Sequence, residues 1–353
     1  MDFAKNERLL AVLKRVAPGT PLRQSCERII ASRHGALIIL SSRPEVMAIC
    51  QGGFEINCEF LPSRLYELAK MDGAIIVSSD YTRILKANVH LTPDVAITSK
   101  ETGTRSRTSE RVTKQTGAPV LAVSEEMGQI FLFMDDTKYA LEDIRLVLSR
   151  AAQALQTLEK YRTRLGQVLK TLTGLELEGL AALEEVVVAI TRFEMVERVS
   201  KEIHGFVIEL GVDGRLIEMQ LEELVSGVDA EYENLIKDYC RLKKGCSLFD
   251  IQGKMAGLSD EELLDPAMVA RAIGYAGSLE ALAQHVTPKG YRLLCRVPRL
   301  SQPVINRLVE RFGNLNNLVR ASRQQLEAVE GVGAARARVI RDSLRRLSET
   351  IVA

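Results

Sequence analysis

The amino-acid sequence predicts an α/β domain with a mixed sheet, followed by an all-α spine domain and a C-terminal domain of short paired helices. Short apolar runs separated by glycine turns fill the first 140 residues, which is typical of a buried sheet. After residue 141 apolar residues recur every three or four positions, and after residue 288 a helix–turn–helix pattern occurs twice. A chain of 353 residues is long for one domain. We therefore expect domains at residues 1–140, 141–287 and 288–353.

The N-terminal domain alternates helical patterns with strand-sized apolar runs. Apolar residues at helical spacing predict helices over residues 2–16 and 22–32. Buried strands are expected at residues 35–40, 73–79, 84–91, 120–123 and 129–134, with turns at Gly52-Gly53 and Thr102-Gly103. A mixed sheet flanked by helices is the natural packing for these elements.

The central domain begins with one long helix. From Leu141 to Leu172 a single apolar stripe continues without interruption, so this helix serves either as a rigid spine or as a seam for self-association. The pattern stays helical to about residue 287, with a turn at residues 211–214 and a loop at residues 243–246. No cluster of reactive side chains stands out in this domain.

Composition excludes several classes of protein. Hydrophobic residues make up 46% of the chain and charged residues 26%, which argues against a disordered chain and against a disulfide-stapled peptide. No apolar run approaches the roughly 18 residues of a membrane-spanning helix. The charged N-terminus lacks the apolar segment of a secretory signal, so a cytoplasmic location without membrane contact is expected.

The net charge of +1 hides an asymmetry along the chain. Residues 289–353 contain 13 Lys and Arg against 5 Asp and Glu, whereas residues 176–265 contain 21 acidic against 9 basic residues. A basic end of this kind indicates a nucleic-acid-binding segment. A solvated, arginine-rich helical surface explains the charge equally well, so charge alone does not decide.

The C-terminal segment contains a repeated small pattern. Residues 326–340 read as a helix, a tight turn at Gly331-Val332-Gly333 and a second helix, and residues 294–305 form a degenerate copy. Both resemble helix-hairpin-helix motifs, whose turn exposes backbone N–H groups that hold a phosphate oxygen. Arg336, Arg338 and Arg341 would supply positive charge to the DNA phosphates without contacting the bases. The alternative is a hairpin that only packs.

Two stretches of the α/β domain have the composition of a ligand site. Asp72 precedes Gly73 at the start of a predicted strand. A carboxylate at this place can contact a ligand, and the glycine, which has no side chain, lets the ligand approach the backbone. After Gly103, five successive residues carry hydrogen-bond donors, a density that suits a triphosphate: Thr104, Arg105, Ser106, Arg107 and Thr108. A strand-end aspartate beside an arginine-rich solvent loop is the plainer interpretation of the same residues.

These stretches resemble the diadenylate cyclase family, whose signatures are DGA and RHR. Here the signatures read Asp72-Gly73-Ala74 and Gly-Thr-Arg-Ser-Arg-Thr-Ser-Glu-Arg over residues 103–111. Flanking agreement is found at residues 51–54, 65–71, 87–94 and 114–117. With the helical spine and the helix-hairpin-helix end, the resemblance covers nearly the whole chain and favours the branch of the family that carries a DNA-binding end.

The resemblance implies a nucleotidyltransferase that condenses two ATP molecules into cyclic di-AMP and two pyrophosphates. It also implies a homo-octamer with face-to-face cyclase domains, and a nucleoid-associated protein that scans DNA for damaged or branched structures such as Holliday junctions. Asp72 would bind Mg²⁺ or Mn²⁺ and help to activate a ribose 3′-hydroxyl, with Arg105 and Arg107 as further catalytic residues. Gly73 and Leu91 would line the nucleotide pocket, and Thr104 to Thr108 would hold the phosphates.

The sequence departs from the family pattern at one position. Ser106 stands where the RHR signature has histidine, and a serine hydroxyl is shorter and cannot carry imidazolium charge. Both flanking arginines remain, so we expect ATP binding to be retained, whereas the full rate of cyclic di-AMP formation is less certain to be. The alternative function is therefore a DNA-binding scaffold whose cyclase domain binds ATP but is weakly active or inactive.

Overall fold

The computed structural model describes residues 7–241 and 248–352. The chain divides into two compact units, which are treated separately below. The first consists of Met1–Ala154 with Lys201–Met219, and the second of Leu155–Ser200 with Gln220–Ala353. The loop predicted at residues 243–246 and the start of the first predicted helix lie outside the described residues.

The first unit contains the predicted mixed sheet. Its strands are β1 Ala36–Leu40, β2 Cys50–Gln51, β3 Phe54–Glu59, β4 Ala74–Val77, β5 Arg83–Leu91, β6 Val120–Ser124, β7 Gln129–Met134 and β8 Thr137–Leu141. They run in the order β2-β5-β4-β1-β6-β7-β8, and β3 pairs with β5. The pairing of β1 with β4 is parallel, whereas the other pairings are antiparallel.

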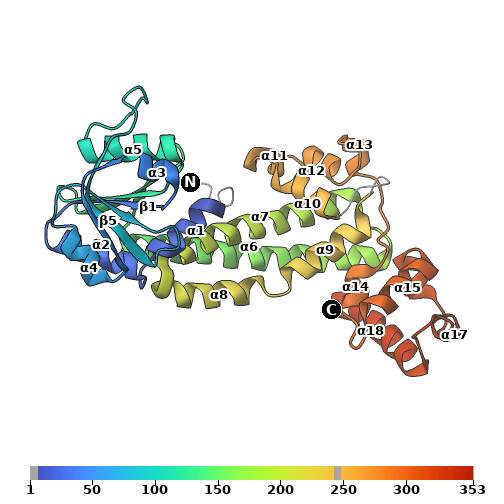
Figure 1. Cartoon of the computed structure of the whole chain (residues 1–353). Helices are drawn as coiled ribbons and strands as arrows, with labels where there is room; N and C mark the ends of the chain where they lie inside the picture. The colour runs from blue at the N-terminus through green and yellow to red at the C-terminus, as the bar shows by residue number, and fades with distance from the viewer. Residues whose placement is uncertain (1–6, 242–247, 353) are drawn as a thin grey trace. The chain divides into compact units, whose positions relative to one another are not determined.

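Helices cover both faces of this sheet. They are α1 Glu7–Val16, α2 Pro21–Ala31, α3 Pro44–Ala48, α4 Pro62–Leu68 and α5 Thr104–Thr116. Figure 1 shows α3 and α5 on one face and α2 and α4 on the other. Every residue of β1 and β4 is buried, as expected for strands covered on both faces. On the α5 side the core includes Ile39, Ile76 and Val112, which are completely buried.

Five of the strands lie where the sequence predicts them, and β2, β3 and β8 were not predicted. The prediction relied on continuous apolar runs, which mark strands buried on both faces. In β3 no residue is fully buried, and β8 begins with the exposed Thr137 and Lys138. These strands lie toward the edges of the sheet, where one face stays in contact with solvent.

The long predicted helix is α6 Ile144–Glu178, a single helix of 35 residues. Leu141 was predicted to begin it but ends β8 instead. The helix starts after Asp143, whose carboxylate accepts a hydrogen bond from the Arg145 N–H at 2.8 Å. The helices that follow are α7 Leu183–Leu210, α8 Arg215–Val225, α9 Val228–Tyr239, α10 Leu248–Ala256, α11 Asp260–Leu264, α12 Pro266–Ala272 and α13 Leu279–Leu282.

The turn predicted between α7 and α8 is a short 3-10 helix at Gly211–Gly214. Gly211 has a φ of +54°, and a Cβ at this position would lie 2.4 Å from the carbonyl oxygen of Pro18. Both the backbone conformation and the lack of space therefore require glycine here.

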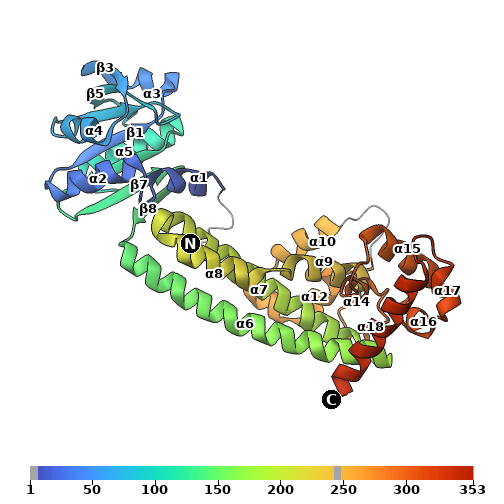
Figure 2. The same ribbon diagram turned by 90° about the horizontal axis from the view of Figure 1, so that it is seen from below.

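The second unit ends in a cluster of short helices. They are α14 Tyr291–Cys295, α15 Gln302–Phe312, α16 Leu315–Arg320, α17 Arg323–Glu327 and α18 Ala334–Val352. Figure 2 shows them gathered at the C-terminal part of the chain. Their shared apolar core includes Leu294, Leu308 and Leu326, and the partly buried Leu177 of α6 packs against it.

A buried polar network joins this helix cluster to α6 and α9. Arg292 of α14 is 1% exposed, and its Nη2 donates to Thr173 Oγ1 at 2.9 Å and to the Glu176 carboxylate. The Tyr239 hydroxyl donates to the other oxygen of Glu176 at 2.6 Å. Asp238 accepts the first N–H groups of α14, from Gly290 at 2.7 Å, from Tyr291 at 2.7 Å and from Arg292 at 2.9 Å.

Burying the charged groups of this network costs free energy, because it removes them from water. Only a well-paired geometry offsets that cost. Burial raises the pKa of Asp238 to about 6, although the three N–H groups oppose this shift. An ion pair withdrawn from water stabilises a fold only when both charges are present. The C-terminal helices of the second unit are thus tied to α6 and α9 through buried polar contacts, and the predicted boundary at residue 288 stays a prediction.

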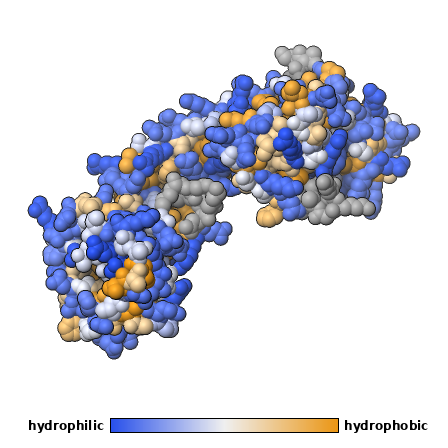
Figure 3. All heavy atoms as spheres, turned by 90° about the horizontal axis from the view of Figure 1, so that it is seen from above, coloured by the Kyte–Doolittle hydropathy of each residue, from blue (hydrophilic) through white to orange (hydrophobic). Residues whose placement is uncertain are grey.

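No helix among the described residues is long and apolar enough to cross a membrane. The face of the molecule in Figure 3 is mostly hydrophilic, and its apolar residues gather in small separate patches. Single exposed apolar side chains such as Leu264 are ordinary on protein surfaces.

We predict that Arg292→Met lowers the free energy of unfolding by about 3–5 kcal/mol, because it leaves the Glu176 charge buried without its cation. Adding Glu176→Gln should recover part of this loss, since the buried charge is then gone. Urea denaturation of the single and double variants measures the coupling. Equal losses in Arg292→Met and the double variant would contradict it.

The matched control is Arg323→Met. Arg323 also pairs with a glutamate, Glu327, at 2.6 Å, but both side chains are partly exposed. Loss of such a surface pair should cost less than about 1 kcal/mol.

Candidate functional site

The entrance to β4 is held against β5 by a glycine. Gly73 has a φ of +102°, and a Cβ there would lie 2.9 Å from the backbone carbon of Asn88 and 3.0 Å from the Val89 oxygen. Any larger residue would push these strands apart. The neighbouring Asp72 is exposed, so its carboxylate is presented to solvent at the start of the strand.

Strand register brings the predicted nucleotide residues to one edge of the sheet. Leu37 of β1 lies opposite Ala74 of β4, and Ala74 lies opposite Val89 of β5. The starts of β1 and β4 therefore meet the end of β5. Asp72, Gly73 and Leu91, which ends β5, all lie at this edge; their assignment to a nucleotide pocket stays a prediction.

The five donor-bearing residues begin a helix and do not form a loop. Gly103 is the N-cap of α5, and no side chain caps the first turn. Thr104, Arg105 and Arg107 are exposed, while Ser106 and Thr108 are half-buried. The uncapped N–H groups and the positive end of the helix dipole both favour a phosphate, so the helix adds donors that a loop would lack.

The two arginines of this turn have different surroundings. Arg105 lies over Gly35, at the start of β1: a Cβ on Gly35 would be 2.1 Å from Arg105 Nη1. Arg105 is thereby brought to the sheet edge that carries Asp72. Arg107 turns back to its own loop, where its guanidinium donates to the carbonyl oxygens of Glu101 at 3.4 Å and Thr102 at 3.3 Å.

Residues 92–103, which precede α5, are fastened to its side. Glu110 accepts hydrogen bonds from Ser99 Oγ at 2.5 Å and from the Lys100 N–H at 3.0 Å. Lys114 pairs with the same carboxylate at 2.8 Å, and Arg111 donates to the Ile97 oxygen at 3.0 Å. Desolvation opposes the shift, but the hydrogen bonds from Lys114 and Ser99 lower the pKa of Glu110 to about 2.

Sequence reasoning missed this fastening. The residues that provide it include Arg107, the adjacent pair Glu110 and Arg111, and Lys114, so that each pair member lies three or four residues from Arg107 and from Lys114 along α5. That spacing places them on one face of a helix, so the signal was available once residue 104 was taken as a helix start.

The donor set at the sheet edge fits a divalent ion that arrives with a nucleotide. Within residues 7–241 and 248–352, no group of three or more His, Cys, Asp or Glu residues is arranged to hold a metal. A single exposed carboxylate such as Asp72 is typical of Mg²⁺ sites, where phosphates and water complete the shell. Asp72 is the residue that would hold the ion.

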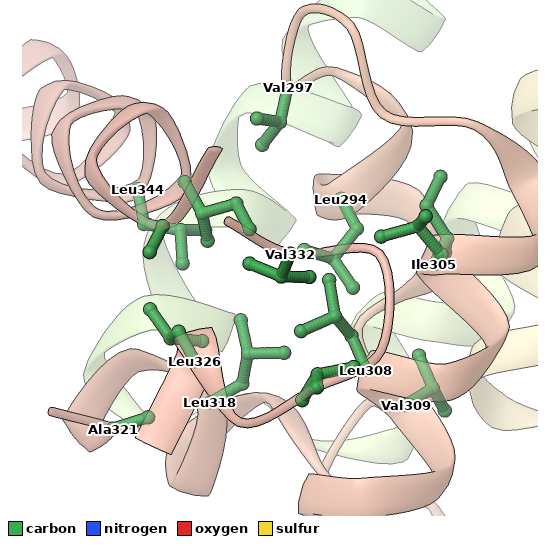
Figure 4. Packing of buried hydrophobic residues seen from close by; sticks show 14 of the residues in the cluster. Leu294, Val297, Ile305, Leu308, Val309, Leu318, Ala321, Leu326, Val332 and Leu344 are labelled. Carbon is green, nitrogen blue, oxygen red and sulfur yellow. The ribbon is translucent and has the colours of Figure 1, made fainter. Parts of the chain in front are cut away.

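The C-terminal turn has the geometry of a helix-hairpin-helix motif. Val332 is 3% exposed and points into the apolar core, between the exposed Gly331 and Gly333 (Figure 4). Gly331 has a φ of +87°, and a Cβ there would lie 3.1 Å from Val304 Cγ2. The buried valine anchors the turn, while both glycines leave its backbone open to solvent.

The three predicted DNA-contacting arginines lie at different places on α18. Arg336 is at the turn, where its Nη1 donates to the Gly331 oxygen at 2.5 Å. Arg338 is exposed, and its Nε lies 3.8 Å from Asp342 Oδ2. Arg341 lines a hollow beside Leu177 and other residues of the second unit. All three stay predictions, and Arg336 is the one that the fold places beside the glycines.

The degenerate copy also folds as two helices joined by a turn, α14 and α15. Arg299 has a φ of +64° in this turn and occupies the place that Gly331 has in the other copy. Both hairpins contribute to one core, with Val297 in the first turn and Val332 in the second.

Comparison with known families covers all three segments. The nucleotide-binding model of the DisA bacterial checkpoint controller matches residues 23–138, and the linker model of the same controller matches residues 141–282. A helix-hairpin-helix motif matches residues 314–343. Fold and site together define a nucleotide-binding protein of the diadenylate cyclase class with a helix-hairpin-helix end.

Whole-chain relatives agree with this class and carry one name, DNA integrity scanning protein DisA. The protein from Acidothermus cellulolyticus is 48% identical over 354 residues, covering 99% of this chain and 96% of the relative. That from Carboxydothermus hydrogenoformans is 47% identical over 345 residues, covering 98% of each. That from Streptomyces coelicolor is 47% identical, covering 97% of this chain and 92% of the relative. The chain belongs to the DisA family.

Proposed function

We propose that the protein condenses two ATP molecules into cyclic di-AMP with release of two pyrophosphates, and that DNA bound at its C-terminal motif regulates this reaction. The observation that carries the proposal is the convergence at one sheet edge of Asp72, Gly73 and the Arg105 guanidinium. The nucleotide-binding match and the relatives' name support the same assignment.

The reaction needs two nucleotides held in opposite directions. The 3′-hydroxyl of each ATP attacks the α-phosphorus of the other, forming a P–O bond as the bond to the departing pyrophosphate breaks. One cyclase domain holds one ATP, so two domains meet face to face, and a homo-octamer provides four such pairs. Such transfers depend chiefly on in-line positioning and on neutralised charge.

This chain's residues divide the work by position. Asp72 would help to activate the ribose hydroxyl that loses its proton, and it would hold Mg²⁺ or Mn²⁺, which would neutralise phosphate charge. Arg105 and Arg107 pair with phosphate oxygens, and the hydroxyls and N–H groups of residues 104–108 donate to the remainder. Gly73 and Leu91 border the nucleoside.

We predict that Asp72→Asn lowers cyclic di-AMP formation by at least about 100-fold. Loss of a residue that only supports a metal ligand already lowers activity by about 10- to 100-fold, and Asp72 would bind the metal itself. The substitution removes charge and almost no volume, so the melting temperature should stay unchanged. The matched control is Asp136→Asn, an exposed aspartate at the β7–β8 turn, which should keep full activity. Product is measured by chromatography with Mg²⁺ or Mn²⁺, and a well-folded, active Asp72→Asn variant would remove Asp72 from the site.

Ser106 motivates the second candidate function, a DNA-binding scaffold that binds ATP with little or no turnover. Ser106 is half-buried in the first turn of α5, where a histidine would add a charged donor. We predict that Ser106→His raises the rate by roughly fivefold, since a charged hydrogen bond exceeds a neutral one by about 1 kcal/mol. An unchanged or lower rate would mean that the pocket is adapted to serine, and wild-type protein that binds ATP without forming product would establish the scaffold.

DNA binding is assigned to the turn at Gly331-Val332-Gly333, with Arg336 beside it. Contacts made through phosphates are insensitive to base sequence and weaken steeply with salt. A branched DNA such as a Holliday junction engages several C-terminal ends of one octamer, giving avidity that a short duplex lacks. Association with chromosomal DNA would place the protein at the nucleoid.

We predict that Gly333→Asp lowers affinity for a four-way junction at least about tenfold, because a carboxylate then faces the phosphates. Gly333 precedes α18, and no atom lies within 4 Å of a Cβ built there, so aspartate is tolerated as an N-cap. Gly333→Asn is the neutral control and should bind nearly as wild type. The junction should inhibit the cyclase in wild type and Gly333→Asn but not in Gly333→Asp; equal inhibition in all three would refute the coupling.

A further inference from the structure

We propose that Gly35 is a positioning residue, because its missing side chain provides the seat that holds the Arg105 guanidinium at the nucleotide edge. The inference rests on the proposed function and adds to it a residue that touches neither substrate nor metal. No signature of the family resemblance includes Gly35, which lies about 70 positions before Arg105 in the sequence.

The contact between the two residues is close and specific. A Cβ on Gly35 would lie 2.1 Å from Arg105 Nη1 and 2.8 Å from Arg105 Cζ, well inside van der Waals contact. The guanidinium therefore occupies the space that a side chain at Gly35 would fill. The third near atom is the Val123 carbonyl oxygen at 3.2 Å, which limits that space on the β6 side.

The backbone does not itself require glycine at this position. The φ angle of Gly35 lies outside the left-handed region, in contrast to Gly73, whose conformation excludes other residues. Gly35 is buried at the start of β1. What excludes a side chain at Gly35 is mainly the end of a flexible arginine, so an alanine there displaces Arg105 more readily than it disturbs the sheet.

The seat leaves the charge of Arg105 available. Within the described part of the chain no carboxylate pairs with Arg105, and its hydrogen bond to Ser109 uses the backbone oxygen. A guanidinium that lies in this space and is not neutralised keeps its donors and charge for a phosphate oxygen. A displacement of about 1 Å from the productive geometry costs about 100-fold in rate when a reaction depends on positioning.

The experiment compares Gly35→Ala with wild type in the full-length protein. We expect cyclic di-AMP formation to fall about 10- to 100-fold, with weaker binding of ATP and unchanged binding of adenosine, because only the phosphate contact is disturbed. The melting temperature should stay within about 2 °C of wild type. Gly166→Ala is the matched control, since no atom lies within 4 Å of a Cβ at Gly166, and it should keep full activity.

A double-mutant cycle separates the seat from a general structural role. In an Arg105→Ala background the space over Gly35 is empty, so adding Gly35→Ala should cause no further loss of activity or of ATP affinity. A further loss equal to that in wild type would overturn the proposal, as would a fully active Gly35→Ala variant. If Gly35→Ala fails to fold, the double variant decides: a folded double variant supports the seat, and an unfolded one assigns the clash to Val123 and overturns it.

Failure of the seat and failure of the proposed function give different results. Wild-type protein that binds ATP but forms no cyclic di-AMP overturns the cyclase assignment, and the seat is then tested by the ratio of ATP to adenosine affinity alone. Wild-type protein with full activity and a Gly35→Ala variant with an unchanged ratio overturns only the seat.

Discussion

The close backbone contact between Gly73 and β5 is the constraint on which the nucleotide edge depends. With the Asn88 carbon 2.9 Å from the place of a Cβ at Gly73, β4 can begin beside β5 only if the residue just before the strand has no side chain. That contact aligns the start of β4 with the end of β5, and parallel pairing brings the start of β1 to the same edge. Asp72, Leu91 and the Arg105 guanidinium over Gly35 inherit their places from this register.

The second unit shows why net charge is a poor measure of a DNA-binding surface. Part of the excess of 13 basic over 5 acidic residues after residue 288 is used inside the protein. Arg292 is buried against Glu176, with its Nε and Nη1 unsatisfied among the described atoms, and it contributes nothing to an external field. Other arginines, exposed or partly exposed, have carboxylate partners of their own, among them Arg296, Arg307, Arg323 and Arg338. In the proposed DNA contact, the backbone N–H groups at the Gly333 turn would thus matter more than the arginine count suggests.

How much the sequence predicts depends on the range of the contacts involved. Fully buried strands such as β1 and β4 and the spine helix α6 were predicted, because burial on both faces or along one stripe leaves a periodic signal. The polar edge strands and the start of α5 at Thr104 were not predicted. Strands buried on one side leave only a weak apolar pattern, and a glycine N-cap lacks the side chain that usually marks the start of a helix. At the site, Asp72 and Gly73 were assigned from a local motif, and their roles stay predictions. The contact between Gly35 and Arg105 joins residues far apart in the chain, and only the packing of α5 on the sheet brings them together.

The two arginines at the start of α5 differ in their surroundings, and in the proposed function they would act differently on a phosphate. In the proposed function, the Arg105 guanidinium already lies over Gly35, and its charge would need little reorganisation when a phosphate arrives. Arg107 makes only long hydrogen bonds, 3.3 and 3.4 Å, to carbonyl oxygens of its own loop. Exchanging them for a charged phosphate costs little, because hydrogen bonds weaken with length and a phosphate is the stronger acceptor. Since the Glu110 and Arg111 contacts fasten the same loop independently, Arg107 can leave its carbonyl partners without releasing the loop.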